Sequence, residues 1–121
     1  MRIGELAERA GTSTRTLRYY ESQGILPVRR APNGYRDYDE DDLRLVREIR
    51  SLLAMGLGLD ETRPFVDCLR AGHESGGVCP DSIQVFRRKL ADLDRCIAAL
   101  TQAREQVSAE LAAALHHRTE N

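Results

Sequence analysis

Residues 3–24 of the chain read IGELAERAGTSTRTLRYYESQG and contain two short amphipathic segments, each followed by a glycine. The first segment places its apolar residues on one helical face and stops at Gly11, a residue type that favours helix C-termini. In the second segment Leu17 and Tyr20 have the spacing of core residues, and Gly24 ends it. Two short helices joined by a tight turn predict a helix-turn-helix.

The second helix of such a pair is the one that reads DNA. It lies in the major groove, where its N-terminal side chains reach base edges and its cations contact phosphates. In this chain the side chains so placed are Thr14, Arg15 and Arg18. Any two helices packed as a hairpin show the same apolar spacing, so this segment alone leaves DNA binding and a purely structural role open.

The next stretch favours DNA binding. Residues 28–38, VRRAPNGYRDY, place three arginines and two tyrosines around an Asn-Gly pair. Asn-Gly favours a β-hairpin because both residues tolerate positive φ angles, and short β-prone runs flank it. A hairpin this small must pack on other elements. Beside a helix-turn-helix it would form a wing, and Arg29, Arg30 and Arg36 would reach the phosphates that flank the groove.

Composition and charge limit the class of protein. The 121 residues are 41% hydrophobic and 31% charged, which fits a soluble globular chain. The formal net charge is −1, yet residues 1–38 carry seven arginines against four acidic residues, so the N-terminal end is the candidate polyanion contact. No apolar run approaches the roughly 18 residues of a membrane span and no signal region opens the chain, so we expect a cytoplasmic protein.

Motifs of catalysis are missing from the sequence. We find no phosphate-binding loop, no nucleophile elbow, no zinc-protease motif and no paired carboxylates, because the acidic residues are scattered along helix surfaces. An enzyme is therefore not expected.

The residues IGELAERAG, RYYE, GIL and NGYR followed by Tyr38 stand in the order and spacing of a known domain. From Ile3 to about Gly56, and more loosely beyond, the chain resembles the DNA-binding domain of the MerR family of transcriptional regulators. The resemblance makes Arg18 a phosphate contact and Arg15 a base-reading residue. A loop one residue shorter than in some relatives leaves Arg29 as the alternative to Arg30. The predicted DNA-binding residues are Thr14, Arg15, Arg18, Tyr19, Arg30, Tyr35, Arg36 and Tyr38.

A long helix is predicted at the end of the chain. From Asp81 to about His116, apolar residues recur in steps of three and four, which is a heptad pattern broken once by the charged Arg104. A helix of that length spans about 54 Å at 1.5 Å per residue, more than the rest of the chain can cover, so a partner must bury the seam. The seam residues are Ile83, Phe86, Leu90, Leu93, Ile97, Leu100, Val107 and Leu111.

These patterns predict a mainly α-helical protein. We expect a winged helix-turn-helix domain with two connector helices over residues 1–70, a linker over 71–80, and a long dimerisation helix with a short C-terminal tail over 81–121. The resemblance implies that the long helix pairs as an antiparallel coiled coil with a second copy, and that the homodimer binds a palindromic promoter operator. It also implies control of transcription by distortion of promoter DNA, with RNA polymerase as a further partner.

Two alternatives remain open at this point. The chain could be an architectural DNA-binding protein that acts by occupancy and needs no effector. It could also be a coiled-coil protein-interaction module in which the basic N-terminal end has no DNA-binding role.

The cysteines, at positions 68, 79 and 96, are odd in number and form no C-x-x-C pair. We therefore expect reduced thiols, with Cys68 packed as a small buried residue. Cys79 precedes Pro80 at the predicted start of the long helix, where the helix dipole favours a thiolate and hence metal or electrophile chemistry.

An effector site at Cys79 is one hypothesis. The resemblance places a ligand cysteine here in metal sensors, which add cysteines after the long helix, whereas this chain has LHHRTEN. In an antiparallel dimer His116 and His117 of one chain would lie near Cys79 of the other, and this Cys/His set could hold Zn²⁺ or a related ion. Alternatively, Cys79 is a small residue at a helix start and the two histidines are solvated.

Overall fold

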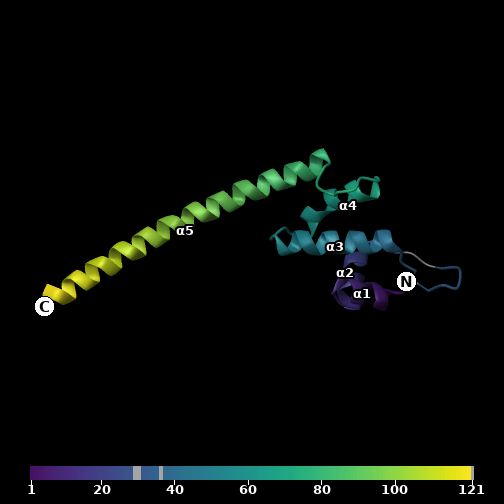
Figure 1. Cartoon of the computed structure of the whole chain (residues 1–121), viewed down its shortest axis with the longest axis horizontal. Coiled ribbons are helices and arrows are strands. Elements are labelled where there is room, and N and C mark those ends of the chain that lie inside the picture. Colours follow the sequence, from purple (N-terminus) through teal and green to yellow (C-terminus); the bar gives the residue numbers. More distant parts are fainter. Residues whose placement is uncertain (29–30, 36, 121) are drawn as a thin grey trace. The chain divides into compact units, whose positions relative to one another are not determined.

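The computed structural model describes residues 1–28, 31–35 and 37–120. The chain is mainly helical, as predicted, and the described residues form no β-strand. Two compact units are present, Met1–Ile83 and Gln84–Asn121. Within the described part of the chain, no helix is both long and apolar enough to cross a membrane. The α-helices, labelled in Figure 1, are α1 (Ile3–Ala10), α2 (Thr14–Ser22), α3 (Glu40–Ala54), α4 (Arg63–Arg70) and α5 (Pro80–Glu120). A 3₁₀ turn, η1 (Asp60–Thr62), directly precedes α4.

The first unit has a core built around α3. Helices α1 and α4 both contact α3, and α2 packs on α1. Each of these helices turns one apolar stripe inward, and removal of that surface from water is the main favourable term of folding. The side chains that are completely or almost completely buried include Leu6, Leu17, Ile25, Leu26, Leu43, Val46, Ile49, Leu52 and Phe65.

The turn between α1 and α2 is the predicted stop at Gly11. Gly11 has a φ of 70°, its N–H donates to the Glu8 carbonyl at 3.1 Å, and the Thr12 N–H donates to the Ala7 carbonyl at 2.9 Å. This pattern is a Schellman motif, which satisfies the last carbonyls of α1. The positive φ favours glycine there, while a Cβ would meet only Nη1 at the flexible end of the Arg50 side chain, 2.9 Å away.

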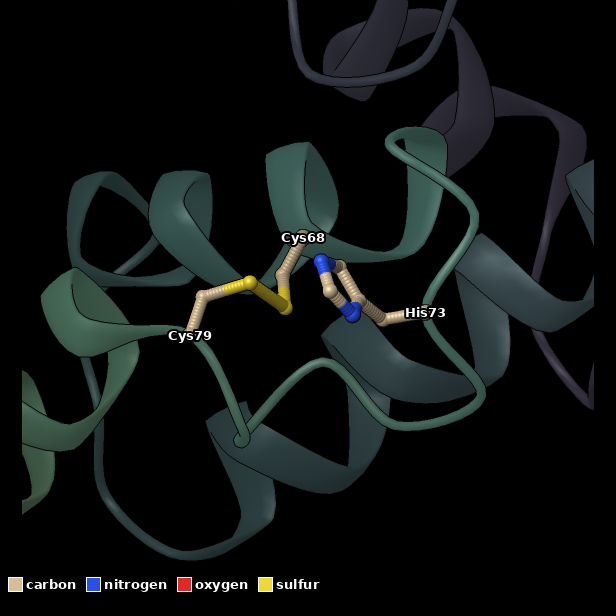
Figure 2. Close-up of side chains that lie close together, drawn as sticks. All are labelled: Cys68, His73 and Cys79. Carbon is tan, nitrogen blue, oxygen red and sulfur yellow. A yellow bond between two sulfur atoms is a disulfide. The ribbon is translucent and has the colours of Figure 1, made fainter.

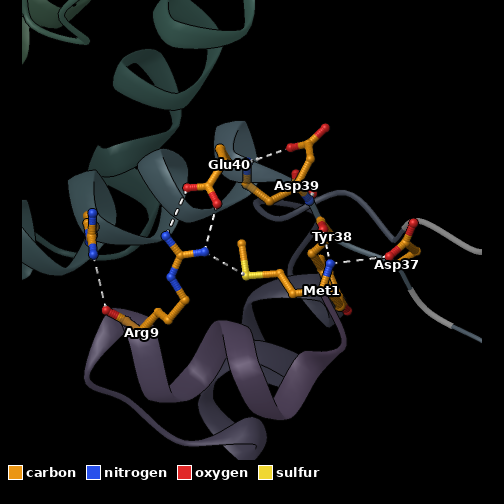
Figure 3. Close-up of polar contacts among 8 residues, drawn as sticks. Met1, Arg9, Asp37, Tyr38, Asp39 and Glu40 are labelled. Carbon is orange, nitrogen blue, oxygen red and sulfur yellow. Dashed lines mark hydrogen bonds and ion pairs between the residues drawn. The ribbon is translucent and has the colours of Figure 1, made fainter.

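Helix α3 begins with an N-cap at Asp39. The Asp39 carboxylate accepts from the Asp42 N–H at 3.0 Å, and the Asp42 carboxylate accepts from the Asp39 N–H at 3.0 Å. This reciprocal capping box satisfies two backbone donors that a helix start would otherwise leave unpaired. Just before it, the backbone N–H of Tyr38 donates to the carbonyl of Met1 at 2.7 Å. The terminal amine of Met1 donates to the carbonyl of Tyr38 at 2.6 Å (Figure 3).

The prediction of a β-hairpin was wrong for the described residues. The described residues of the segment 27–38, which we call the 27–38 loop, form turns rather than strands. A type I′ hairpin turn needs positive φ at both central residues, whereas Gly34 has a φ of 85° and the described non-glycine residues have none. The Asn33 side chain accepts from the Tyr35 N–H at 3.2 Å, and Ala31 N–H donates to the Tyr35 carbonyl at 2.6 Å. Hydrogen bonds within these turns therefore use backbone N–H and C=O groups that would otherwise pair between two β-strands.

The long helix α5 confirms the helix predicted for the end of the chain. It starts at Pro80, a residue type suited to the first helical position, and continues without a break to Glu120. The predicted seam side chains in it are mostly exposed in the single chain: Leu100 has an exposed fraction of 71%, while Phe86 is half-buried. Pairing of this helix with a second copy stays a prediction.

Candidate nucleic-acid interface and cysteine cluster

Helix α2 has two faces with different roles. Leu17 and Tyr20 are buried, so they anchor the helix on the core, and burial raises the pKa of the Tyr20 hydroxyl. Arg15 and Arg18 are exposed, and Tyr19 has an exposed fraction of 55%. The outward face therefore presents two cations and an aromatic ring on a rigid helix, which is the combination that contacts phosphates and bases.

The N-terminal end of α2 is fixed by its cap. The Ser13 side chain accepts from the Thr16 N–H at 3.1 Å, which satisfies one of the first backbone donors. Thr14, the first residue of the helix, is half-buried. Other backbone N–H groups of this end are not used inside the helix, so they too can meet an anion.

The other elements hold α2 in place. At its C-terminal end Gly24 has a φ of 72° and the Ile25 N–H donates to the Tyr20 carbonyl at 3.0 Å. The Arg63 guanidinium of α4 donates to the Gln23 carbonyl at 2.7 Å. At the preceding turn, the Arg50 side chain of α3 donates to the Ala10 carbonyl. The turns at both ends of α2 are thus tied to the connector helices α3 and α4, so the outward face of α2 has a defined orientation in the first unit.

The 27–38 loop adds a second exposed aromatic. Tyr35 has an exposed fraction of 58%, and the Arg2 guanidinium lies 4.1 Å from its ring centroid, a cation–π contact. Arg2 was not among the predicted DNA-binding residues. Its signal was a cation directly before the first helix, in the basic N-terminal end of the chain. The predicted contacts Arg30 and Arg36, and the alternative Arg29, lie outside the described residues.

Tyr38 is placed differently from the other predicted contacts. Its side chain is buried, with an exposed fraction of 2%, and its hydroxyl donates to the Glu21 carboxylate. In this conformation the ring has no surface to offer to a phosphate. Tyr38 instead ties the end of the 27–38 loop to α2.

An ion pair joins α1 to the start of α3. Arg9 donates from Nη1 to Oε1 of Glu40 at 2.7 Å and from Nη2 to Oε2 at 3.1 Å (Figure 3). The hydrogen bond to Arg9 lowers the pKa of the Glu40 carboxyl, and the same bond raises the pKa of the Arg9 guanidinium. Both side chains are well exposed, so solvent screens the pair and its contribution to stability is small.

The prediction of reduced thiols was wrong for two of the three cysteines. Cys68 near the end of α4 and Cys79 directly before α5 form a disulfide, with their Cα atoms 5.9 Å apart. Cys68 is buried as predicted, but it is not a free thiol. The loop 71–79 folds back over α4 and brings together two residues 11 positions apart, a tertiary effect that spacing alone does not reveal. Cys96, on α5, is a free and exposed cysteine.

A histidine completes a cluster with these sulfurs. His73, in the loop 71–79, points toward Cys68 and Cys79 in Figure 2, and one ligand atom from each of the three lies within 4.8 Å of the others. His116, by contrast, belongs to the second unit and pairs with Glu120, with 2.9 Å between Nε2 and Oε1. His73 stands in a stretch without periodicity and was not among the predicted ligands. The spacing C-x₄-H-x₅-C was the available signal.

Comparison with known families now decides the identity. The model of the MerR HTH family regulatory protein matches residues 1–67, and the model of the MerR DNA-binding region matches residues 43–109. The chain belongs to the MerR family of transcriptional regulators. MerR-family proteins regulate transcription by binding DNA and are not enzymes, which confirms both predictions.

Individual MerR-family relatives agree with this assignment. The chain is 34% identical over 104 residues to the HTH-type transcriptional regulator HmrR of Rhizobium leguminosarum bv. viciae, covering 86% of this chain and 78% of that protein. A crystal structure of the transcription regulator PbrR691 from Ralstonia metallidurans CH34, in complex with lead(II), aligns with a TM-score of 0.71 and 33% identity, over 88% of this chain and 82% of the other. HiNmlR, a MerR family regulator lacking the sensor domain and bound to promoter DNA, aligns with a TM-score of 0.59 and 25% identity, over 87% and 78% of the two chains.

Proposed function

We propose that this MerR-family regulator acts as a homodimer that binds a palindromic promoter operator through α2 and the 27–38 loop. The observation that carries the proposal is the outward face of α2, where Arg15, Arg18 and Tyr19 are exposed on a helix whose other face is locked into the core. Two such faces, related by a two-fold axis, require a palindromic site. Arg2 beside Tyr35 joins Arg18 as a phosphate contact, Arg15 reads bases, and Tyr38 holds the loop in position rather than meeting DNA.

The dimer is supported by the exposed seam of α5. Apolar side chains with the spacing of a heptad are costly to leave in water, and a second α5 would bury them. Leu90, Ile97 and Leu100 each have exposed fractions above 60% in the single chain. An antiparallel pairing would hold two first units apart on the DNA, and distortion of the promoter between them would then give RNA polymerase access.

An effector that acts near Cys79 is the finer part of the proposal. PbrR691, a relative by sequence and fold, was crystallised in complex with lead(II). When reduced, the Cys68, His73 and Cys79 cluster would offer this chain two sulfur ligands and an imidazole, which suit soft and borderline metal ions. The ligand set first predicted, Cys79 with His116 and His117 of a second chain, would require the antiparallel dimer. The alternative is regulation by occupancy without an effector.

Salt-dependent DNA binding tests the proposal. Fluorescence anisotropy with operator-bearing and random duplexes should show affinity that falls steeply with salt. Arg18→Ala should weaken binding to both duplexes and reduce the slope of log K against log salt by about 1, the value for one lost phosphate contact. Arg87→Ala, which removes an exposed arginine from α5, is the matched control and should bind as wild type. Equal affinities for all three proteins, or a slope that Arg18→Ala leaves unchanged, would exclude α2 as the contact.

A further inference from the structure

None of the DNA contacts proposed above belongs to the Cys68, His73 and Cys79 cluster. All three residues belong to the first unit, and Cys68 is buried, Cys79 half-buried and His73 exposed. The two cysteines come from the last turn of α4 and the residue before α5, so the cluster stands where the connector helices meet the long helix (Figure 2).

The backbone holds this cluster together independently of the disulfide. The carbonyl of Cys68 accepts from the His73 N–H at 3.4 Å, and the Cys79 carbonyl accepts from the Ile83 N–H in the first turn of α5 at 3.0 Å. Between them Gly76 is buried, and a Cβ there would lie 2.8 Å from the Phe65 carbonyl oxygen, so the loop presses directly on α4. The three ligands therefore remain neighbours when the sulfurs are not bonded to each other.

The distances suit a metal ion. Ligand atoms about 2.0–2.3 Å from a tetrahedral Zn²⁺ are about 3.6 Å apart, and the three atoms here lie within 4.8 Å of one another. Rotation of the exposed His73 side chain can supply the shift of about 1 Å on its side. The two sulfurs, which are bonded to each other here, must separate to about 3.8 Å once they are reduced. Two thiolates and an imidazole are soft and borderline ligands, which favour Zn²⁺ and related ions over Mg²⁺ or Ca²⁺.

We propose that the reduced protein binds one Zn²⁺ per chain through Cys68, His73 and Cys79, and that the disulfide and the metal are alternative states of one site. A sulfur committed to the S–S bond is not a thiolate ligand, so the two states exclude each other. Solvent occupies the fourth ligand position. A regulatory effect of this site on transcription rests on the function proposed above. Binding of the ion itself does not depend on that function.

Interconversion of the two states balances as follows. A cellular dithiol gives two electrons and two protons to the Cys68–Cys79 bond, which breaks to give two thiols while the dithiol closes to its own disulfide. Zn²⁺ then binds with release of the two thiol protons. In the reverse direction hydrogen peroxide takes two electrons from the bound thiolates and two protons from solution, the number that zinc binding had released. The S–S bond forms, the O–O bond breaks to give two water molecules, and Zn²⁺ leaves.

This site makes a prediction different from the pairing of Cys79 with His116 and His117. In the proposed site every ligand comes from one chain, and removal of the two C-terminal histidines has no effect. In the alternative, His73 is dispensable. The two can therefore be separated by histidine variants that leave both cysteines in place.

The test uses the full chain, reduced with a phosphine and stripped with a chelator, because dithiols themselves bind zinc. Zn²⁺ affinity is measured by competition with a chromophoric chelator, and Co²⁺ is used to record sulfur-to-metal charge-transfer absorption. Wild type should bind one ion per chain. His73→Gln should lower the affinity at least tenfold, and Cys68→Ser or Cys79→Ser should abolish the charge-transfer band. Cys96→Ser and the double variant His116→Gln, His117→Gln are the controls and should bind as wild type.

The oxidised state gives the second readout. Air-oxidised wild type should not bind Zn²⁺, and peroxide added to the zinc-loaded protein should release one ion for each disulfide formed. His73→Gln should still form the disulfide, which shows that its loss of zinc is not a loss of fold. Zinc binding that survives Cys68→Ser or His73→Gln, that disappears in the double histidine variant, or that is absent in wild type would overturn the proposal. None of these readouts involves DNA, so a failed operator assay and a failed metal assay remain distinct results.

Discussion

Reduction of the Cys68–Cys79 disulfide should destabilise the first unit by a calculable amount. The bond closes a loop between residues 11 positions apart, and the chain-entropy model gives about 3 kcal/mol for loops of this length. That is a change of more than a hundredfold in the unfolding equilibrium. With a urea m-value of about 1–2 kcal/mol/M for a small domain, the midpoint should fall by roughly 1.5–3 M on reduction.

Tyrosine fluorescence is the appropriate assay. The chain has no tryptophan, and its four tyrosines all stand between residues 19 and 38, so the signal reports the first unit and not α5. Urea titrations would compare wild type with and without a phosphine reductant, both with a chelator to exclude metal. Cys96→Ser should unfold at the wild-type midpoint in each condition, because that cysteine is free and exposed. Coincident curves for oxidised and reduced wild type would refute the claim that the bond constrains the unfolded first unit.

Three further predictions concern the core, the α1–α3 ion pair and the seam. Leu17→Ala removes a completely buried side chain beneath the DNA-reading face and should cost about 2–5 kcal/mol in urea unfolding; a cost below about 1 kcal/mol would mean that α2 is not anchored there. The bond to Arg9 holds the folded-state pKa of Glu40 below its unfolded value, so its contribution is present above the unfolded pKa and is lost as pH falls through the folded pKa. Glu40→Gln should therefore lower the urea midpoint slightly at pH 7 and leave it unchanged well below pH 4. A larger effect in acid than at pH 7 would contradict the lowered pKa of Glu40. Ile97→Glu puts a charge in the exposed seam of α5 and should shift the protein from dimer to monomer in sedimentation equilibrium; a wild type that is already monomeric would exclude the seam as an interface.

The helical part of the fold could be predicted because its determinants are local. The helix stops at Gly11 and Gly24 depend on a few neighbouring residues, and each occurs where the pattern placed it. The heptad repeat likewise predicted one long helix, and α5 is that helix. Resemblance to the family then supplied the role of α2, which apolar spacing alone left open.

The errors have two causes, which are a local turn that admits more than one conformation and contacts between distant parts of the chain. Asn-Gly was interpreted as a hairpin turn, but in the structure only its glycine has a positive φ, and the described residues around it form turns. Tyr38 was assigned to the surface, yet contacts with Met1 and with Glu21, far away in sequence, place it in the core. The disulfide depends on how the loop 71–79 packs on Phe65, and the sequence of that loop has no periodicity from which this packing could be predicted.

Helix α4 has a mechanical consequence for the whole first unit. At its start the Arg63 guanidinium donates to the carbonyl of Gln23, the C-cap of α2. Near its end Cys68 is bonded to Cys79, the residue that precedes α5. Its eight residues form a stiff rod about 12 Å long. Because bonds at both ends hold α4, a tilt of this helix at Cys68 would also displace Arg63 and the end of α2 that Arg63 contacts. The sulfur chemistry at Cys68 and the angle at which Arg15 and Arg18 meet a groove are therefore separated by little more than two turns of helix.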